Sequence, residues 1–147
     1  MKIRRWVGLL LITVALVTSG CSDFVDSDQL HASPESRATL TPDHPVGQTF
    51  VARHGGLNGV EVWLDPGFGS EGELRLHLRV EPDAEEDLAT ATFPVTAVTA
   101  PDFYRFSFSP LRNSHGGYYY AFVEMEGTVE INVGTGPGDA YLDGALY

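Results

Sequence analysis

The chain has 147 residues, of which nine are basic and 20 acidic, so its formal net charge is −11. This length suits one domain rather than two. A chain this acidic lacks the basic surface that nucleic-acid binding requires, and it is repelled by anionic lipid head groups. The composition therefore predicts a single domain whose own side chains bind neither nucleic acid nor a membrane.

The first 20 residues have the pattern of an export signal. Lys2, Arg4 and Arg5 form a basic start, and 6–17 is almost wholly apolar before the small residues that follow. The apolar run is shorter than the roughly 20 residues that a membrane-spanning helix needs, so we expect cleavage rather than insertion. Loss of this leader leaves six arginines, no lysine and 20 acidic residues, a net charge of about −14.

The single cysteine of the chain directly follows this leader. The segment 17–21, Val-Thr-Ser-Gly-Cys, resembles the lipobox of bacterial lipoprotein precursors. The resemblance implies that Cys21 is lipidated and becomes the first residue of the mature protein. The protein would then be extracytoplasmic and lipid-anchored to the cell membrane or, as Ser22 favours in two-membrane bacteria, the outer membrane. The alternative is an ordinary secretory signal that leaves a free thiol.

Segment 22–45 is polar, contains Pro34, Pro42 and Pro45, and has no sustained apolar period. These features predict a disordered tether between the lipid and a folded domain. The predicted division of the chain is a signal peptide at 1–20, a lipidated tether at 21–45 and a folded domain at 46–147.

From residue 46 onward, short runs alternate apolar and polar residues between Gly, Pro, Asp and Asn, as strands joined by turns do. Leu74, Leu76 and Leu78 form one apolar stripe, and Val129, Ile131 and Val133 form a second that we also expect in the core. No long helical period follows the leader. The predicted fold is all-β, a two-layer antiparallel β-sandwich of the jelly-roll kind. Its eight expected strands lie near residues 47–53, 60–65, 74–80, 88–93, 103–108, 118–125, 129–133 and 141–147.

Catalysis has little support in the sequence, and we expect no enzyme. Ser114 and His115 are neighbours in a Gly-rich turn, but a nucleophile and its base must meet through a fold that also orients them. A hydrolase is therefore a remote alternative. No His or Cys spacing is typical of zinc. The acidic loops at 65–73, 83–87 and 139–143 leave room for a structural calcium ion, and we expect no other cofactor.

Aromatic residues give the best indication of a ligand site. Trp63 falls on the polar side of its strand, and three consecutive tyrosines at 118–120 must divide between two faces. An exposed ring is costly unless it packs under other groups or serves a ligand such as a sugar. The alternative is that these rings only cover the edge of the sandwich. The candidate ligand-binding residues are Trp63, Arg75, His77, Arg79, Tyr119 and Asn132.

Six fragments follow one another along 46–147. They are GQTFV at 47–51, LNGVEV at 57–62, GELRLHL at 72–78, FSFSPL at 106–111, NSHG at 113–116 before the tyrosines, and DAYLDG at 139–144. This succession resembles uncharacterised extracytoplasmic domains of bacterial exported proteins and of glycosyltransferase-associated membrane proteins. The resemblance implies a β-sandwich similar to carbohydrate-binding modules and no catalytic residue.

Together, these features predict a non-catalytic lipoprotein whose sandwich binds a glycan or a cell-envelope polymer. The alternative is a structural or assembly lipoprotein that binds another envelope protein. The tyrosines and Trp63 favour the first, whereas the lack of a defined polar constellation keeps the second open.

Overall fold

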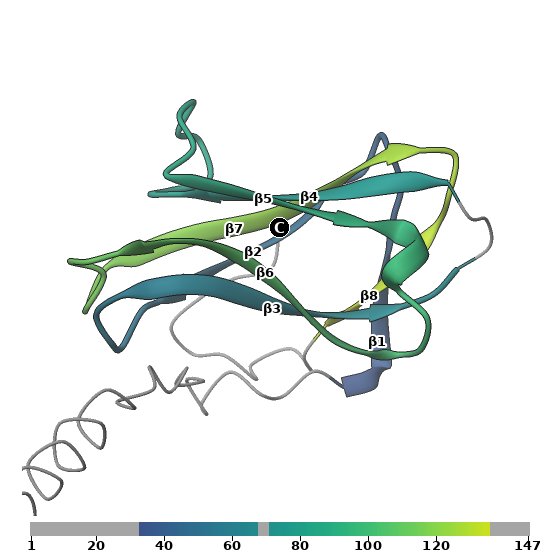
Figure 1. Ribbon diagram of the computed structural model, residues 1–147, viewed down its shortest axis with the longest axis horizontal. Helices are drawn as coiled ribbons and strands as arrows, with labels where there is room; N and C mark the ends of the chain where they lie inside the picture. Colours follow the sequence, from purple (N-terminus) through teal and green to yellow (C-terminus); the bar gives the residue numbers. More distant parts are fainter. Residues whose placement is uncertain (1–32, 68–70, 136–147) are drawn as a thin grey trace, which may run out of the picture.

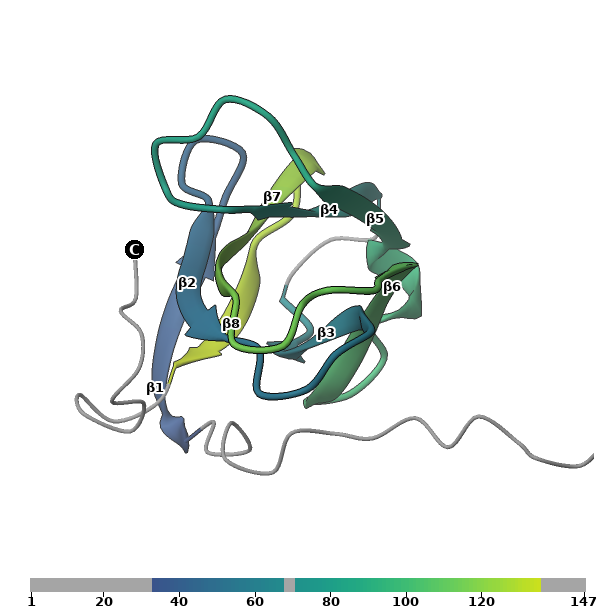
Figure 2. The same ribbon diagram turned by 90° about the vertical axis from the view of Figure 1, so that its left-hand side faces the viewer.

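A computed structural model of the chain describes residues 33–67 and 71–135, with side chains from residue 37 onward. Within these ranges, eight strands form two four-stranded antiparallel sheets that pack face to face as a sandwich (Figure 1, Figure 2). The predicted all-β sandwich is confirmed. The strands are β1 (Ser33–Leu40), β2 (Val46–Val51), β3 (Leu57–Asp65), β4 (Gly72–Arg79), β5 (Ala89–Pro94), β6 (Asp102–Leu111), β7 (Tyr118–Gly127) and β8 (Ile131–Thr135), and a short 3-10 helix, η2 (Val95–Ala97), follows β5.

The strand order is that of a jelly roll. One sheet has the order β1-β8-β3-β6 and the other β2-β7-β4-β5. β1 therefore pairs with β8, β2 with β7, β3 with β6 and β4 with β5, as in a long hairpin that has been folded over on itself. Only the β4–β5 connection stays within one sheet, and every other connection crosses to the opposite layer, which is the topology of two nested Greek keys.

The core lies between the two sheets and contains both predicted apolar stripes. The leucines at 74, 76 and 78 have no exposed surface, and Val129, Ile131 and Val133 are 5% exposed or less. The period of two in the sequence thus identified the inward faces of β4 and β8 correctly. Phe106 from β6 and Leu64 from β3 belong to the same buried cluster as Leu74, whereas Leu78 belongs to a second cluster with Phe50.

The sandwich begins earlier than the sequence predicted. Residues 33–40, which we expected within a disordered tether, form β1, and Leu40 is fully buried opposite Ile131. The following residues make a tight turn, because the His44 amide donates to the Thr41 carbonyl at 3.0 Å. The tether prediction is therefore wrong from residue 33 onward. It failed because β1 is an edge strand that presents few apolar side chains, so its alternation is weak.

The leader, Cys21 and the strand expected at 141–147 lie outside the described residues. In the described part of the chain, no helix is long and apolar enough to span a membrane.

Candidate functional site

The six residues that the sequence singled out lie in three places. Trp63 and Asn132 lie on the outer face of the β1-β8-β3-β6 sheet, because their strand neighbours Leu64 and Val133 point inward. Arg75, His77 and Arg79 lie on the outer face of the other sheet, while Tyr119 points into the core. These residues therefore do not form one site.

Tyr119, which we expected to contact a ligand, lies in the core of the sandwich. Its side chain is 9% exposed and packs against Phe50 in the core, with 5.8 Å between the ring centroids. Tyr118 and Tyr120 take the outward positions because side chains alternate along a strand. Tyr118 is 47% exposed. The sequence showed that the tyrosines must divide, but the inward residue is fixed only by the pairing of Tyr119 with Phe50 across β7 and β2.

Trp63 is partly covered on its own sheet. The Arg37 guanidinium of β1 lies 5.5 Å from the centre of the indole and forms an ion pair with Asp65. Gly134 belongs to β8, the strand between β1 and β3, and a Cβ atom at this position would lie only 2.7 Å from Trp63 Cε3. Trp63 thus helps to fasten β1 onto the sheet, in line with the alternative that this ring covers part of the sandwich. On the same face, the Asn132 amide oxygen lies 3.3 Å from the Thr39 hydroxyl.

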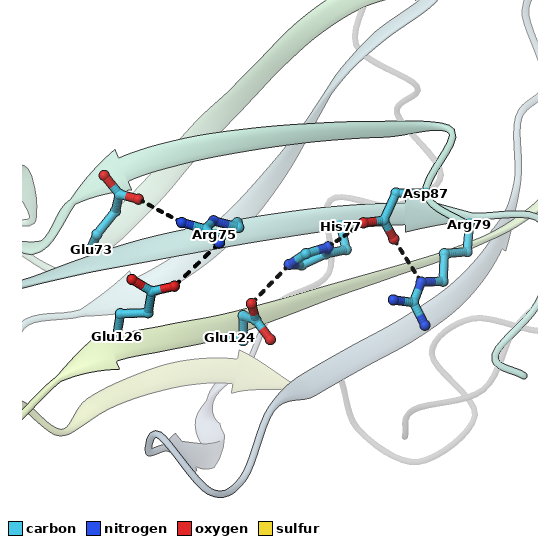
Figure 3. Close-up of polar contacts among 7 residues, drawn as sticks. All are labelled: Glu73, Arg75, His77, Arg79, Asp87, Glu124 and Glu126. Atoms are coloured by element: carbon cyan, nitrogen blue, oxygen red, sulfur yellow. Dashed lines mark hydrogen bonds and ion pairs between the residues drawn. The ribbon is translucent and has the colours of Figure 1, made fainter. Parts of the chain in front are cut away.

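The outer face of the β2-β7-β4-β5 sheet carries a network of polar contacts among charged side chains and His77 (Figure 3), with aromatic side chains beside it. We call its central part the β4–β7 face. Its members are Glu73, Arg75, His77 and Arg79 of β4, Tyr118, Tyr120, Phe122, Glu124 and Glu126 of β7, and Asp87 of the loop between β4 and β5.

His77 lies at the centre of the β4–β7 face. Its Nδ1 atom is 2.7 Å from a carboxylate oxygen of Asp87, and its Nε2 atom is 3.0 Å from one of Glu124. The ring stacks on Phe122 with 4.6 Å between centroids and 9° between planes. Only 12% of the side chain is exposed. His77 therefore joins the β4–β5 loop to β7.

Arg79 folds the β4–β5 loop back onto its own strand. Its Nε atom donates to Asp87 at 2.7 Å, and its Nη1 atom donates to the Ala84 carbonyl at 2.9 Å. Burial alone would raise the pKa of the Asp87 carboxyl, but the hydrogen bonds and charges of Arg79 and His77 outweigh it, so this pKa is lowered. Asp87 is therefore a firmly ionised anchor for the loop.

Arg75 holds the other end of the network. Its guanidinium lies 3.3 Å from Glu73 on its own strand and 3.2 Å from Glu126 on β7. These partners are substantially exposed, and exposed pairs contribute at most about 1 kcal/mol each. The Arg75 pairs therefore order the surface of the sheet more than they stabilise the fold.

The aromatic side chains of the β4–β7 face form a row. Phe122 stacks on His77 and also on Tyr120, with 5.3 Å between the centroids of the second pair. Tyr120 leans over Gly47 of β2, where a Cβ atom would lie 2.6 Å from the tyrosine oxygen. Because His77 and Tyr120 both stack on Phe122, its ring faces are largely used within the protein. The exposed ring of the row is Tyr118, which the sequence did not single out.

Ser114 and His115 each form a hydrogen bond with a backbone carbonyl. Ser114 is fully buried, and its Oγ atom donates to the His54 carbonyl at 3.1 Å and accepts from the Leu57 amide at 2.9 Å. The His115 Nδ1 atom instead lies 2.6 Å from the Arg53 carbonyl. The Ser114 side chain therefore connects the loop 112–117 to the segment 52–57 through two hydrogen bonds.

Among residues 33–67 and 71–135, no group of three or more His, Cys, Asp or Glu side chains is arranged to hold a metal ion. The acidic loop at 139–143, where we allowed for a calcium ion, lies outside these ranges.

Comparisons with known proteins add no relative. No protein-family model, curated protein or solved structure matches the chain. The functional interpretation therefore depends on the fold and on the geometry of the β4–β7 face.

Proposed function

We propose that this protein is a non-catalytic, extracytoplasmic lipoprotein that is anchored through Cys21 and binds a glycan or a cell-envelope polymer on the β4–β7 face. The observation that carries the proposal is the position of Tyr118. This exposed ring lies in line with Tyr120 and Phe122 on β7, next to a network of hydrogen-bonding side chains. Sugar rings are bound by stacking on an aromatic face and by hydrogen bonds from neighbouring polar groups.

The charges of the β4–β7 face disfavour an anionic glycan. The face has four carboxylates, two guanidiniums and one imidazole, and each cation already has a carboxylate partner. The mature chain adds a net charge of about −14. A polymer rich in phosphate or uronate groups would be repelled by this field. The ligand class is therefore a neutral or amine-bearing glycan.

The anchor limits where this ligand lies. Because β1 starts at Ser33, 11 residues, 22–32, lie between the sandwich and Cys21, on which we propose the lipid. Eleven residues span at most about 40 Å. The sandwich would therefore reach polymers close to the membrane that carries it.

Mass spectrometry of the mature amino-terminal peptide tests the anchor. We expect a peptide that begins at Cys21 and carries the mass of its lipid, and Cys21→Ser should abolish both the lipid and the retention of the protein in the membrane fraction. An unmodified Cys21, or an uncleaved leader, would contradict this part of the proposal.

A glycan array with the variants Tyr118→Ala and Trp63→Ala tests the binding face. Tyr118 is exposed, so its replacement should leave the fold intact. Stacking on such a ring is worth about 1 to 3 kcal/mol, with base stacking as the analogue, so Tyr118→Ala should weaken binding about tenfold or more. Trp63→Ala, on the opposite sheet, should bind as the wild type does.

The other outcomes of this array are equally informative. Loss of binding only in Trp63→Ala would move the site to the β1-β8-β3-β6 sheet. Absence of binding to any envelope glycan would favour the alternative, a structural or assembly lipoprotein with a protein partner. One observation supports that alternative: the large apolar side chains that are exposed in the described residues, Val80, Leu88 and Tyr118, all lie at the end of the sheet where β4 ends and β7 begins.

A further inference from the structure

The contacts of His77 define the protonation state of its ring. Both ring nitrogens lie within 3.0 Å of carboxylate oxygens, one of Asp87 and one of Glu124. An ionised carboxylate only accepts hydrogen bonds, whereas a neutral imidazole has a single N–H group. While both carboxylates are ionised, both contacts can therefore form together only when the ring carries two protons and a positive charge.

The surroundings of the ring also suit a cation. The ring stacks on the face of Phe122, whose π electrons attract positive charge. Across β5, the nearest outward residues are Thr90 and Thr92, which carry no charge. Two acidic side chains and one aromatic face thus contact the ring.

Other charged groups near His77 are already compensated. Arg75 and Arg79 flank it on β4, and each would oppose a second positive charge. Arg79 shares Asp87 with His77 and also lies over the Phe122 ring, 4.8 Å from its centroid, while Arg75 pairs with Glu73 and Glu126. These pairs reduce the repulsion that the arginines exert on His77.

Loss of one proton would break one of the two contacts. Asp87 is also held by Arg79, and its lowered pKa keeps its carboxylate ionised. Glu124 has no second side-chain partner within the described part of the chain, and its side chain is 39% exposed. The neutral ring therefore keeps its N–H group on Asp87, and Glu124 is released toward solvent.

We propose that His77 is a protonation switch that holds Glu124 against the β4–β7 face while the ring is charged and releases it when the ring becomes neutral. The contact with Glu124 is complete while the ring carries both protons, and it is lost when a rise in pH removes one of them. The switch itself does not depend on what the face binds. Its consequence rests on the proposed function, because release adds an uncompensated carboxylate to the ligand-binding face.

NMR titration of the ligand-free full-length protein between pH 5 and 8.5 tests the switch directly. We expect two bound protons on the His77 ring at the acidic end, and a change in the Glu124 carboxyl ¹³C shift in the same pH step as the loss of one of them. Glu126, which pairs with an arginine, should show no such step. His77→Gln should abolish the step at Glu124. A singly protonated ring throughout, or a Glu124 step that survives His77→Gln, would overturn the proposal.

Stability measurements provide a second readout. At pH 5.5, Glu124→Gln should raise the unfolding equilibrium constant about fivefold, as loss of a partly exposed ion pair does. At pH 8.5 this difference should vanish, because in the wild type the neutral ring has already released Glu124. The matched variant Glu126→Gln should have the same effect at both pH values. Equal pH dependence in the two variants would overturn the switch, while leaving the glycan proposal to its own test.

Discussion

Leu76→Asp is expected to unfold the sandwich. Leu76 is fully buried at the middle of β4, between the strand partners Val123 and Ala91, which are buried as well. The substitution removes about 1.5 to 3 kcal/mol of apolar burial and forces an unpaired carboxylate into the core, which costs several kcal/mol more. The total stability of such a domain is about 5 to 15 kcal/mol. Circular dichroism should show loss of the β signal at neutral pH.

Thr92→Asp is the matched control for this substitution. Thr92 is exposed on the outer face of the adjacent edge strand and is paired with Arg75. A carboxylate there stays in water next to a guanidinium, so we expect a change below about 1 kcal/mol in urea denaturation. Equal damage from the two variants would mean that the inward and outward faces of β4 and β5 are assigned incorrectly.

The fold was predictable where the chain alternates strongly. The leucines of β4 and the β-branched residues near β8 have one buried and one solvated face, so their period of two determines both the strand and its orientation. β1 was missed because its described inward side chains, Ala38 and Leu40, are too few to show a period. Its strand character comes from pairing with β8, about 90 residues later, and local sequence does not contain that contact.

The candidate site was predictable only in part. Alternation placed Arg75, His77 and Arg79 on one outward face, as the structure confirms. Their partners could not be inferred, because Glu124 comes from a strand that joins β4 only in the folded sheet, and Asp87 comes from a loop that bends back.

The partners of His77 determine which substitutions on this face are mild. From its outward position alone, His77→Asp would be a mild substitution, but it would place a third carboxylate between Asp87 and Glu124. Like charges at this spacing repel one another, so a control must be chosen from a side chain outside the network, as Thr92 is.

Ser114→Ala is expected to lower stability by about 2 kcal/mol. The substitution removes one hydroxyl that both donates to the His54 carbonyl and accepts from the Leu57 amide. A hydrogen bond contributes about 1 kcal/mol, and a buried group left without a partner costs somewhat more. In a domain of this size, the midpoint of thermal unfolding should fall by roughly 10 °C. Differential scanning calorimetry measures this shift, and Ser107→Ala, on the exposed face of β6, is the control that should change little.

The Ser114 result also separates a structural role from a catalytic one. The hydrogen bonds of Ser114 hold the loop 112–117 against the segment 52–57. Backbone hydrogen bonds join the same two segments: the Gly116 amide donates to the Ala52 carbonyl at 2.7 Å, and the Ala52 amide donates to the Gly117 carbonyl at 2.9 Å. Tyr118 follows directly, so loss of these hydrogen bonds should also displace its ring and weaken the proposed glycan binding. A variant that keeps wild-type stability but loses a measurable hydrolytic activity would contradict this role and make Ser114 a nucleophile. Loss of stability together with weaker ligand binding is the outcome that the buried hydroxyl and its two backbone partners predict.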